Sequence, residues 1–123
     1  MKSRWITHKG KRILYCDYTS FAPSDFELLK SELEAVESLI YQEPEDSVLG
    51  LSDTRGSVAT SEAVALFKTS ATRTGKYIHK QAVIGISGFK RVLFDAVVRI
   101  SGQNARSFDD IDQAKDWLVE KTG

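Results

Sequence analysis

The chain carries two short, largely apolar runs, at residues 48–51 and 81–87. Neither run alternates polar and apolar positions, which is typical of strands that are covered on both faces. The first run ends in a polar turn that contains glycine, residues 52–57, and a helical pattern begins near Thr60. We therefore predict that residues 48–51 form a central strand. Ligands and partners of α/β sheets tend to bind at the carboxyl ends of the strands, so this turn is the first candidate site.

Further strand patterns lie near the two ends of the chain. Residues 4–8 and 11–18 are rich in strand-favouring side chains, and Lys9-Gly10 between them can form a tight turn because glycine accepts a positive φ. We predict an antiparallel hairpin there. A short extended segment is predicted at residues 106–108.

Four helices are expected from apolar residues spaced three and four apart. The first starts around Pro23, with Ser24 and Glu27 as a capping box, and ends before Pro44. Its apolar stripe is Phe26, Leu29, Leu33, Val36 and Ile40, with Glu27, Glu34 and Glu37 off the stripe. The second runs from about residue 60 to 72, with Ala63, Val64, Phe67 and Ala71 inward and Gly75 as its stop. The third spans about residues 88–101, and the fourth spans about 109–121 with Ile111, Ala114, Trp117 and Leu118 inward.

This order predicts an α/β fold: an N-terminal β-hairpin, then alternating helices and strands. Such an alternation implies a mixed, mostly parallel sheet of four to five strands with about four helices and right-handed crossovers. The 123 residues fit one domain, residues 1–123, with no linker or repeat.

The third predicted helix has more apolar surface than one sheet contact needs. Phe94 and Val98 fall outside its main apolar face, beside Lys90 and Arg91. They are either covered by another helix, or exposed singly, or part of a docking patch for a partner, a membrane surface or an apolar ligand.

Composition excludes several classes of function. The formal net charge is zero, so no global field recruits nucleic acid. Charge is nevertheless segregated along the chain: residues 1–12 and 68–99 are basic, and residues 25–46 are acidic apart from Lys30. Solvated helix faces and a polarised, partner-steering surface both fit this pattern. A single cysteine, no signal-peptide pattern in residues 1–8 and no apolar run long enough for a membrane span lead us to expect a cytoplasmic protein.

Residues that could carry catalytic chemistry are few. His8 and His79 are far apart and belong to no metal-ligand spacing, so we expect neither a metal ion nor a cofactor. Cys16 lies mid-strand with no neighbouring base, which favours a buried apolar role. Residues 85–90 join a strand to a helix and can present amides to an anion, but they lack the length and the lysine-serine/threonine ending of a phosphate-binding loop, so we favour a tight turn. Asp53, at the end of the central strand, is the one plausible acid–base residue, and a turn or cap role is its alternative.

The element order and the turn Asp53-Thr54-Arg55-Gly56 resemble the STAS domain of anti-sigma-factor antagonists. More closely, the chain resembles the bacterial SpoIIAA-like family, which has a STAS-like or CRAL-TRIO-like α/β fold. The resemblance covers nearly the whole chain and is strongest at residues 80–88, 91–94, 99–102, 108–110 and 114–119.

The resemblance to STAS domains implies a signalling role, but the turn departs from the motif of the signalling proteins at the phosphorylated position. Signalling STAS proteins carry Asp-Ser-Ser-Gly at this turn, and a kinase partner phosphorylates the serine before the glycine. Here Asp53 and Gly56 match, Thr54 keeps a hydroxyl, and Arg55 stands at the phosphorylated position. Arginine is no substrate for that chemistry. Two alternatives to phosphorylation at this position are open. A phosphate could be added to Thr54 or Ser57 beside Arg55, or Arg55 could hold an anionic ligand directly.

The likeness to CRAL-TRIO lipid carriers implies a second role, a small apolar ligand held beneath a helix. Our leading hypothesis is a non-catalytic module that binds a small apolar or amphipathic ligand, with peripheral membrane contact as one variant. Its alternative is a protein-interaction module in bacterial stress or sigma-factor signalling, and an enzyme ranks third. The predicted binding residues are Asp53, Thr54, Arg55, Gly56 and Ser57 as a polar rim, with Phe67, Phe94 and Val98 as apolar contacts.

Overall fold

The computed structural model describes residues 1–86, 91, 94–95, 98 and 104–121. One sheet holds five strands: β1 (Arg4–His8), β2 (Lys11–Asp17), β3 (Val48–Asp53), β4 (Ile78–Ile84) and β5 (Ala105–Phe108). Three helices have described bounds: α1 (Phe26–Ile40), α2 (Ser61–Thr74) and α4 (Ile111–Val119). Short 3-10 helices, η1 (Pro23–Asp25) and η2 (Gly75–Tyr77), precede α1 and follow α2.

The sheet confirms the predicted mixed, mostly parallel arrangement, with strand order β1-β2-β3-β4-β5 and β3 at its centre. β1 pairs antiparallel with β2 as the predicted hairpin, and every other neighbouring pair is parallel. Lys9 and Gly10 have φ values of 49° and 81°, the left-handed conformation that a two-residue hairpin turn requires. β4 begins at Ile78, three residues before the predicted start, because the polar residues His79 and Lys80 concealed its first half.

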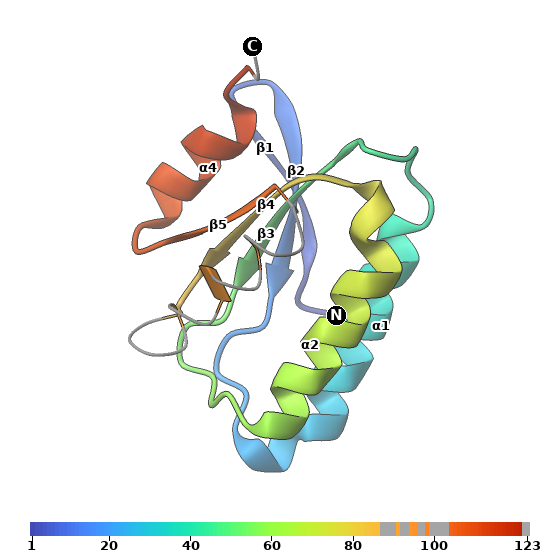
Figure 1. Ribbon diagram of the computed structural model, residues 1–123, viewed down its shortest axis with the longest axis vertical. Helices are drawn as coiled ribbons and strands as arrows, with labels where there is room; N and C mark the ends of the chain where they lie inside the picture. The colour runs from blue at the N-terminus through green and yellow to red at the C-terminus, as the bar shows by residue number, and fades with distance from the viewer. Residues whose placement is uncertain (87–90, 92–93, 96–97, 99–103, 122–123) are drawn as a thin grey trace.

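Helices cover both faces of this sheet (Figure 1). α1 and α2 lie against one face, where the core includes Leu14, Cys16, Tyr18, Leu33 and Val48. α4 lies against the other face, where the core includes Ile13, Tyr15, Leu51, Ile84 and Leu118. The central strand therefore contributes buried side chains to both layers, as its continuous apolar pattern indicated. Within the described residues, no helix has the length and apolar character needed to cross a bilayer.

The start of α1 differs from the prediction. Ser24 lies inside η1, and the carboxylate of Asp25 accepts a hydrogen bond of 2.9 Å from the amide of Ala22. The predicted capping box of Ser24 and Glu27 is therefore wrong, because the turn at Pro23 starts the helical segment earlier. Four of the five predicted stripe residues of α1 are fully buried: Leu29, Leu33, Val36 and Ile40.

Glu37, placed off that stripe by periodicity, is in fact buried. Its carboxylate accepts hydrogen bonds from the guanidinium of Arg73 on α2, the shortest being 2.8 Å. The pair joins the two helices that cover this face, and Glu37 avoids the cost of burying an unpaired charge.

The inward face of α2 also differs from the prediction. Thr60 caps the helix, its hydroxyl accepting a 3.1 Å hydrogen bond from the amide of Ala63. The buried residues are Ala63, Ser70 and Thr74, whereas the predicted Val64 and Ala71 are exposed. The prediction is correct for Ala63 and for Phe67, which is partly buried against the core, but the polar Ser70 and Thr74 are buried where apolar spacing does not reveal them.

α4 matches its predicted inward residues, with Ala114 and Leu118 buried. Its last carbonyls are satisfied from the sheet: the ammonium of the buried Lys80 donates to the carbonyl oxygens of Trp117 at 2.9 Å and Glu120 at 3.1 Å. This contact ends the helix and places it over β4. Most of the predicted third helix lies outside the described residues. The four residues described in its middle part are helical: Arg91, Phe94, Asp95 and Val98.

Candidate functional site

The candidate site is the turn that follows β3. Asp53, the last residue of β3, has an exposed fraction of 0%. Strand alternation places its side chain on the same face as Leu51, the face covered by α4, and Tyr15 of the neighbouring β2 lies on that face too. A carboxylate is thus enclosed at the carboxyl end of the central strand.

Four hydrogen bonds hold the Asp53 carboxylate. Oδ1 accepts from the backbone amide of Arg55 at 3.1 Å and from its Nε at 3.0 Å. Oδ2 accepts from Arg55 Nη2 at 2.7 Å and from the hydroxyl of Tyr15 at 2.6 Å. Both oxygens are therefore fully engaged, and the guanidinium is bound in the bidentate geometry that gives arginine–carboxylate pairs their strength.

These contacts move the pKa values of the site away from neutrality. Burial alone would raise the pKa of Asp53, but the hydrogen bonds from Arg55 and Tyr15 outweigh it and hold the pKa below its usual value. Burial, together with the hydrogen bond to the Asp53 carboxylate, raises the pKa of Tyr15 to about 12. The hydrogen bond to Asp53 raises the pKa of Arg55 further. At neutral pH the site is a fixed carboxylate, a neutral phenol and a permanent cation.

Arg55 is the part of this cluster that reaches solvent. Its side chain is 55% exposed although its partner Asp53 is fully enclosed. The hydrogen bonds to Asp53 use Nε and Nη2, so the outer edge of the guanidinium, with Nη1, faces away from the carboxylate. The arginine is held in one orientation from inside and presents its other edge outward.

Thr54 joins this turn to the end of β4. Its amide and its hydroxyl both donate to the carbonyl oxygen of Ile84, each at 2.9 Å. The next residue, Gly85, has a φ of 97°, and a Cβ there would lie 2.6 Å from the Arg55 amide nitrogen. Glycine is therefore required at this close approach of two backbone segments.

Ser57 joins the same turn to the segment between β2 and α1. Its hydroxyl donates to the carbonyl oxygen of Tyr18 and accepts a 2.8 Å hydrogen bond from the amide of Phe21. Gly56 lies between with a φ of 79°. Because the hydroxyls of Thr54 and Ser57 both hold the turn together, a phosphate on either would first have to break these contacts.

The structure brings together only part of the predicted set. Asp53, Thr54, Arg55, Gly56 and Ser57 form one turn, as their adjacency requires. Phe67 instead packs on the opposite face of the sheet, edge-on to Tyr18 with ring centroids 5.1 Å apart.

Phe94 and Val98 are half-buried helical residues, and most of the helix predicted around them lies outside the described residues. Their predicted contact with an apolar ligand stays a prediction.

Tyr15 is a site residue that sequence reasoning missed. It was assigned only to the hairpin, and its bond to Asp53 depends on the parallel register that sets Tyr15 opposite Leu51 and Asp17 opposite Asp53. An available signal was the position of Tyr15 in phase with the buried Ile13, with a hydroxyl that needs a partner when buried.

The two histidines make separate surface pairs, His8 with Asp116 at 2.8 Å and His79 with Asp46 at 3.1 Å. In the described part of the chain, no three His, Cys, Asp or Glu side chains come together to ligate a metal ion.

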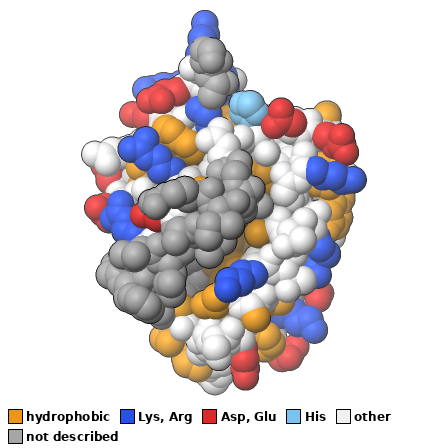
Figure 2. Space-filling model, in the orientation of Figure 1, with side chains coloured by type: hydrophobic (Ala, Val, Ile, Leu, Met, Phe, Trp, Pro, Cys, Tyr) orange, Lys and Arg blue, Asp and Glu red, His pale blue; other side chains and the backbone are white. Residues whose placement is uncertain are grey.

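Surface charge does not separate by sign on the face shown in Figure 2. Lysine and arginine side chains alternate there with aspartate and glutamate side chains.

No family model matches the chain, and no curated protein matches it. Among solved structures, the chain is similar to an uncharacterized protein of the DUF3478 family with a SpoIIAA-like fold from Shewanella loihica PV-4. The match has a TM-score of 0.73 and covers 95% of this chain and 92% of that chain, at 16% sequence identity. This chain has a SpoIIAA-like fold. The expected fold is thus confirmed, and at this identity the likeness concerns the fold alone.

Proposed function

We propose that this SpoIIAA-like chain is a non-catalytic interaction module that binds an acidic side chain of a partner protein through Arg55. The observation that carries the proposal is the half-exposed guanidinium clamped by the enclosed carboxylate of Asp53. An arginine that is already ordered loses little conformational entropy on binding, so more of its interaction energy goes into affinity. Bidentate arginine contacts are also frequent among the residues that dominate protein interfaces.

A binding role fits the electrostatics of the turn better than catalysis does. A general acid or base works best with a pKa near the working pH. The pKa of Asp53 is lowered, and burial raises the pKa of Tyr15 to about 12. The polar atoms of both side chains are also engaged in hydrogen bonds within the cluster, so neither group is free to exchange a proton with a substrate.

An apolar neighbour supports a protein as the partner. Val58 follows the turn and is 54% exposed, with its amide donating to the carbonyl oxygen of Phe21 at 3.1 Å. Val64, in the first turns of α2, is exposed as well. A fixed cation three residues before the exposed Val58 offers the mixture of charge and apolar area found in protein interfaces. The amphipathic-ligand hypothesis depends instead on Phe94 and Val98.

The test has two stages. Native mass spectrometry of the purified protein first determines whether a small molecule is bound. A photo-cross-linking residue at Val58 then captures the partner in cells, and the purified partner is titrated against the protein. Arg55→Glu should weaken that binding at least tenfold, and Arg55→Lys should weaken it less, since lysine keeps the charge but loses the bidentate geometry.

Lys30→Glu is the matched control, because Lys30 is an exposed lysine on α1 and the substitution changes the charge equally. Equal losses for Lys30→Glu and Arg55→Glu would show a general charge effect and refute the role of Arg55. A stoichiometric lipid in the mass spectrum, together with unchanged partner binding in Arg55→Glu, would favour the carrier hypothesis.

A further inference from the structure

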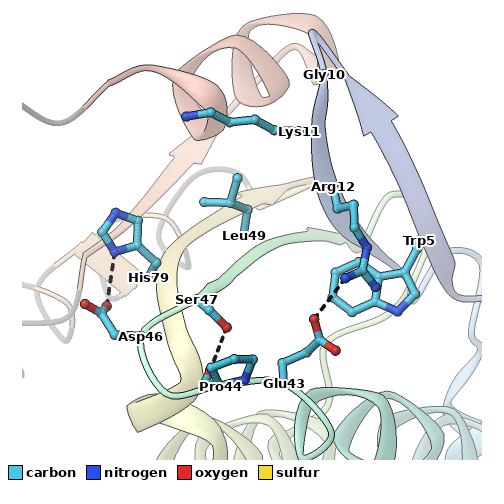
Figure 3. Close-up of a pocket in the computed structure, with 10 residues that line it drawn as sticks. All are labelled: Trp5, Gly10, Lys11, Arg12, Glu43, Pro44, Asp46, Ser47, Leu49 and His79. Atoms are coloured by element: carbon cyan, nitrogen blue, oxygen red, sulfur yellow. Dashed lines mark hydrogen bonds and ion pairs between the residues drawn. The ribbon is translucent and has the colours of Figure 1, made fainter.

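A hollow lies at the end of the sheet opposite to the turn that contains Arg55, where the parallel strands begin (Figure 3). Its volume is about 540 Å³, within the range of small-molecule clefts. The segments that line it are the first residues of β2, β3 and β4, Trp5 of β1, and the loop that leads from α1 to β3. None of these residues belongs to the turn that contains Arg55.

One wall of this hollow is a fixed stack. The guanidinium of Arg12 lies 4.0 Å from the ring centroid of Trp5 and donates a 3.1 Å hydrogen bond to Glu43 Oε1. The charge of Arg12 is therefore already balanced by Glu43. The stack holds both side chains in place along the hollow, as Figure 3 shows.

The other wall is braced in the same way. His79 Nδ1 lies 3.1 Å from Asp46 Oδ1, and the Ser47 hydroxyl donates to the carbonyl oxygen of Pro44 at 2.6 Å. These contacts tie the loop to the start of β4. Leu49, half-buried, lies between the two walls and supplies an apolar floor (Figure 3).

Lys11 is the cation of this hollow that has no carboxylate partner within the described residues. Its side chain is exposed, and within the described part of the chain no hydrogen bond or ion pair engages its ammonium. Arg12 and His79 both have carboxylate partners. The lining thus combines an apolar floor, an aromatic side and an exposed ammonium that has no partner within the described part of the chain.

We propose that this hollow binds a small organic molecule that carries one carboxylate on a flat apolar body. The carboxylate lies at Lys11, and the body lies on Leu49 between the His79 ring and the Arg12–Trp5 stack. A single negative charge fits better than two, because Lys11 is the one cation of the described lining that has no carboxylate partner, and a second negative charge would lie near Glu43 and Asp46 without a cation of its own. The same argument disfavours phosphate esters and nucleotides as ligands.

The experiment uses three probes that share a phenyl body: benzoate, benzamide and phenyl phosphate. Each is titrated into the ¹⁵N-labelled full chain, and amide chemical shifts are followed. Benzoate should shift the amides of Lys11, Leu49 and His79. Benzamide should bind about tenfold more weakly because it lacks the charge, and phenyl phosphate should bind no more tightly than benzoate.

Two variants locate the site. Lys11→Gln should weaken benzoate binding about tenfold, to the level of benzamide. Lys9→Gln is the matched control, since Lys9 lies in the same hairpin but pairs with Asp116 at 3.0 Å outside the hollow, and it should bind benzoate as the wild type does.

Several outcomes would overturn the proposal: no saturable shift with benzoate, equal affinity for benzamide, or equal losses in the two lysine variants. Arg55→Glu should leave benzoate binding unchanged. A failure at this hollow therefore leaves the partner-binding role of Arg55 standing, and the reverse also holds.

Discussion

Asp53 and Arg55 form a bidentate ion pair in which the carboxylate is fully enclosed and the guanidinium is half exposed. The two residues are two positions apart, with Thr54 between them, so the end of β3 positions the carboxylate and the turn after it positions the guanidinium. The asymmetry in exposure means that the two members of the pair respond differently when the other is removed.

Removing Arg55 should cost more stability than removing the charge of Asp53. Arg55→Leu leaves an enclosed carboxylate with only Tyr15 and the local amide as donors, and we expect a loss of about 3 kcal/mol in the free energy of unfolding. Asp53→Asn leaves a guanidinium that can turn to water, with an expected loss of about 1–2 kcal/mol. Urea denaturation at pH 7 measures both.

The double variant is the control for this comparison. Once Asp53→Asn is present, Arg55→Leu should cost much less than it does alone, giving a coupling energy of about 1–3 kcal/mol. Additive losses would show that the pair contributes nothing beyond its separate contacts.

Acid should destabilise the protein through three carboxylates. For Asp53, Asp17 and Glu32, burial alone would raise the pKa, but hydrogen bonds outweigh it and lower the pKa. The bonds to Asp17 come from Thr19, and those to Glu32 come in part from Ser3. Since each folded pKa lies below the ordinary value of 3.8 for Asp or 4.5 for Glu, the stabilisation is complete above these values.

This stabilisation should be lost as the pH falls below about 4 toward the folded pKa values. Urea midpoints measured between pH 7 and pH 3 test the sign. Asp53→Asn should show a shallower fall in acid than the wild type, because one of the three groups no longer titrates. A stability that rises between pH 4 and pH 3 would contradict the assignment.

The fold could be predicted because its strands are apolar on the faces that the helices cover. The run that forms β3 and the hairpin of β1 and β2 have patterns set by local chain geometry, and both were assigned correctly. The inward face of α2 could not be assigned in this way. Ser70 and Thr74 are buried there, and the Thr74 hydroxyl is satisfied by the Ser70 carbonyl oxygen at 2.9 Å, so polarity hides their burial.

In the candidate site, too, residues that are close in the sequence could be predicted, and residues brought together by strand pairing could not. Asp53 and Arg55 were predicted because they are neighbours in one turn. Tyr15 and Gly85 were not, since they meet that turn only through the pairing of β2 and β4 with β3. Likewise Glu37 is buried because of Arg73, a partner 36 residues away that helical periodicity does not reveal.

Gly85 should be much less tolerant of substitution than Gly10. Both have a positive φ, 97° and 81°, so an alanine at either position is strained, at a cost of about 1 kcal/mol. A Cβ at Gly85 would also lie 2.7 Å from Thr54 Oγ1, whereas one at Gly10 would meet nothing within 4 Å.

Gly85→Ala should therefore lose about 2–3 kcal/mol and disturb the turn, and Gly10→Ala should lose only the strain. Thermal and urea unfolding compare the two. Equal losses would mean that the backbone around Thr54 yields without cost.

Cys16 should be unreactive until the protein unfolds. It is the sole cysteine of the chain, is 4% exposed in the core beneath α1, and donates a hydrogen bond of 3.6 Å to the Leu14 carbonyl oxygen. Burial raises the pKa of its thiol to about 12. Since the thiolate is the reactive form, labelling by a disulfide reagent at pH 8 should be on the order of a thousandfold slower in the native protein than in urea. Labelling that follows the urea unfolding curve would confirm that Cys16 reacts through global unfolding. Rapid labelling without denaturant would show instead that the layer of α1 and α2 opens locally above the sheet.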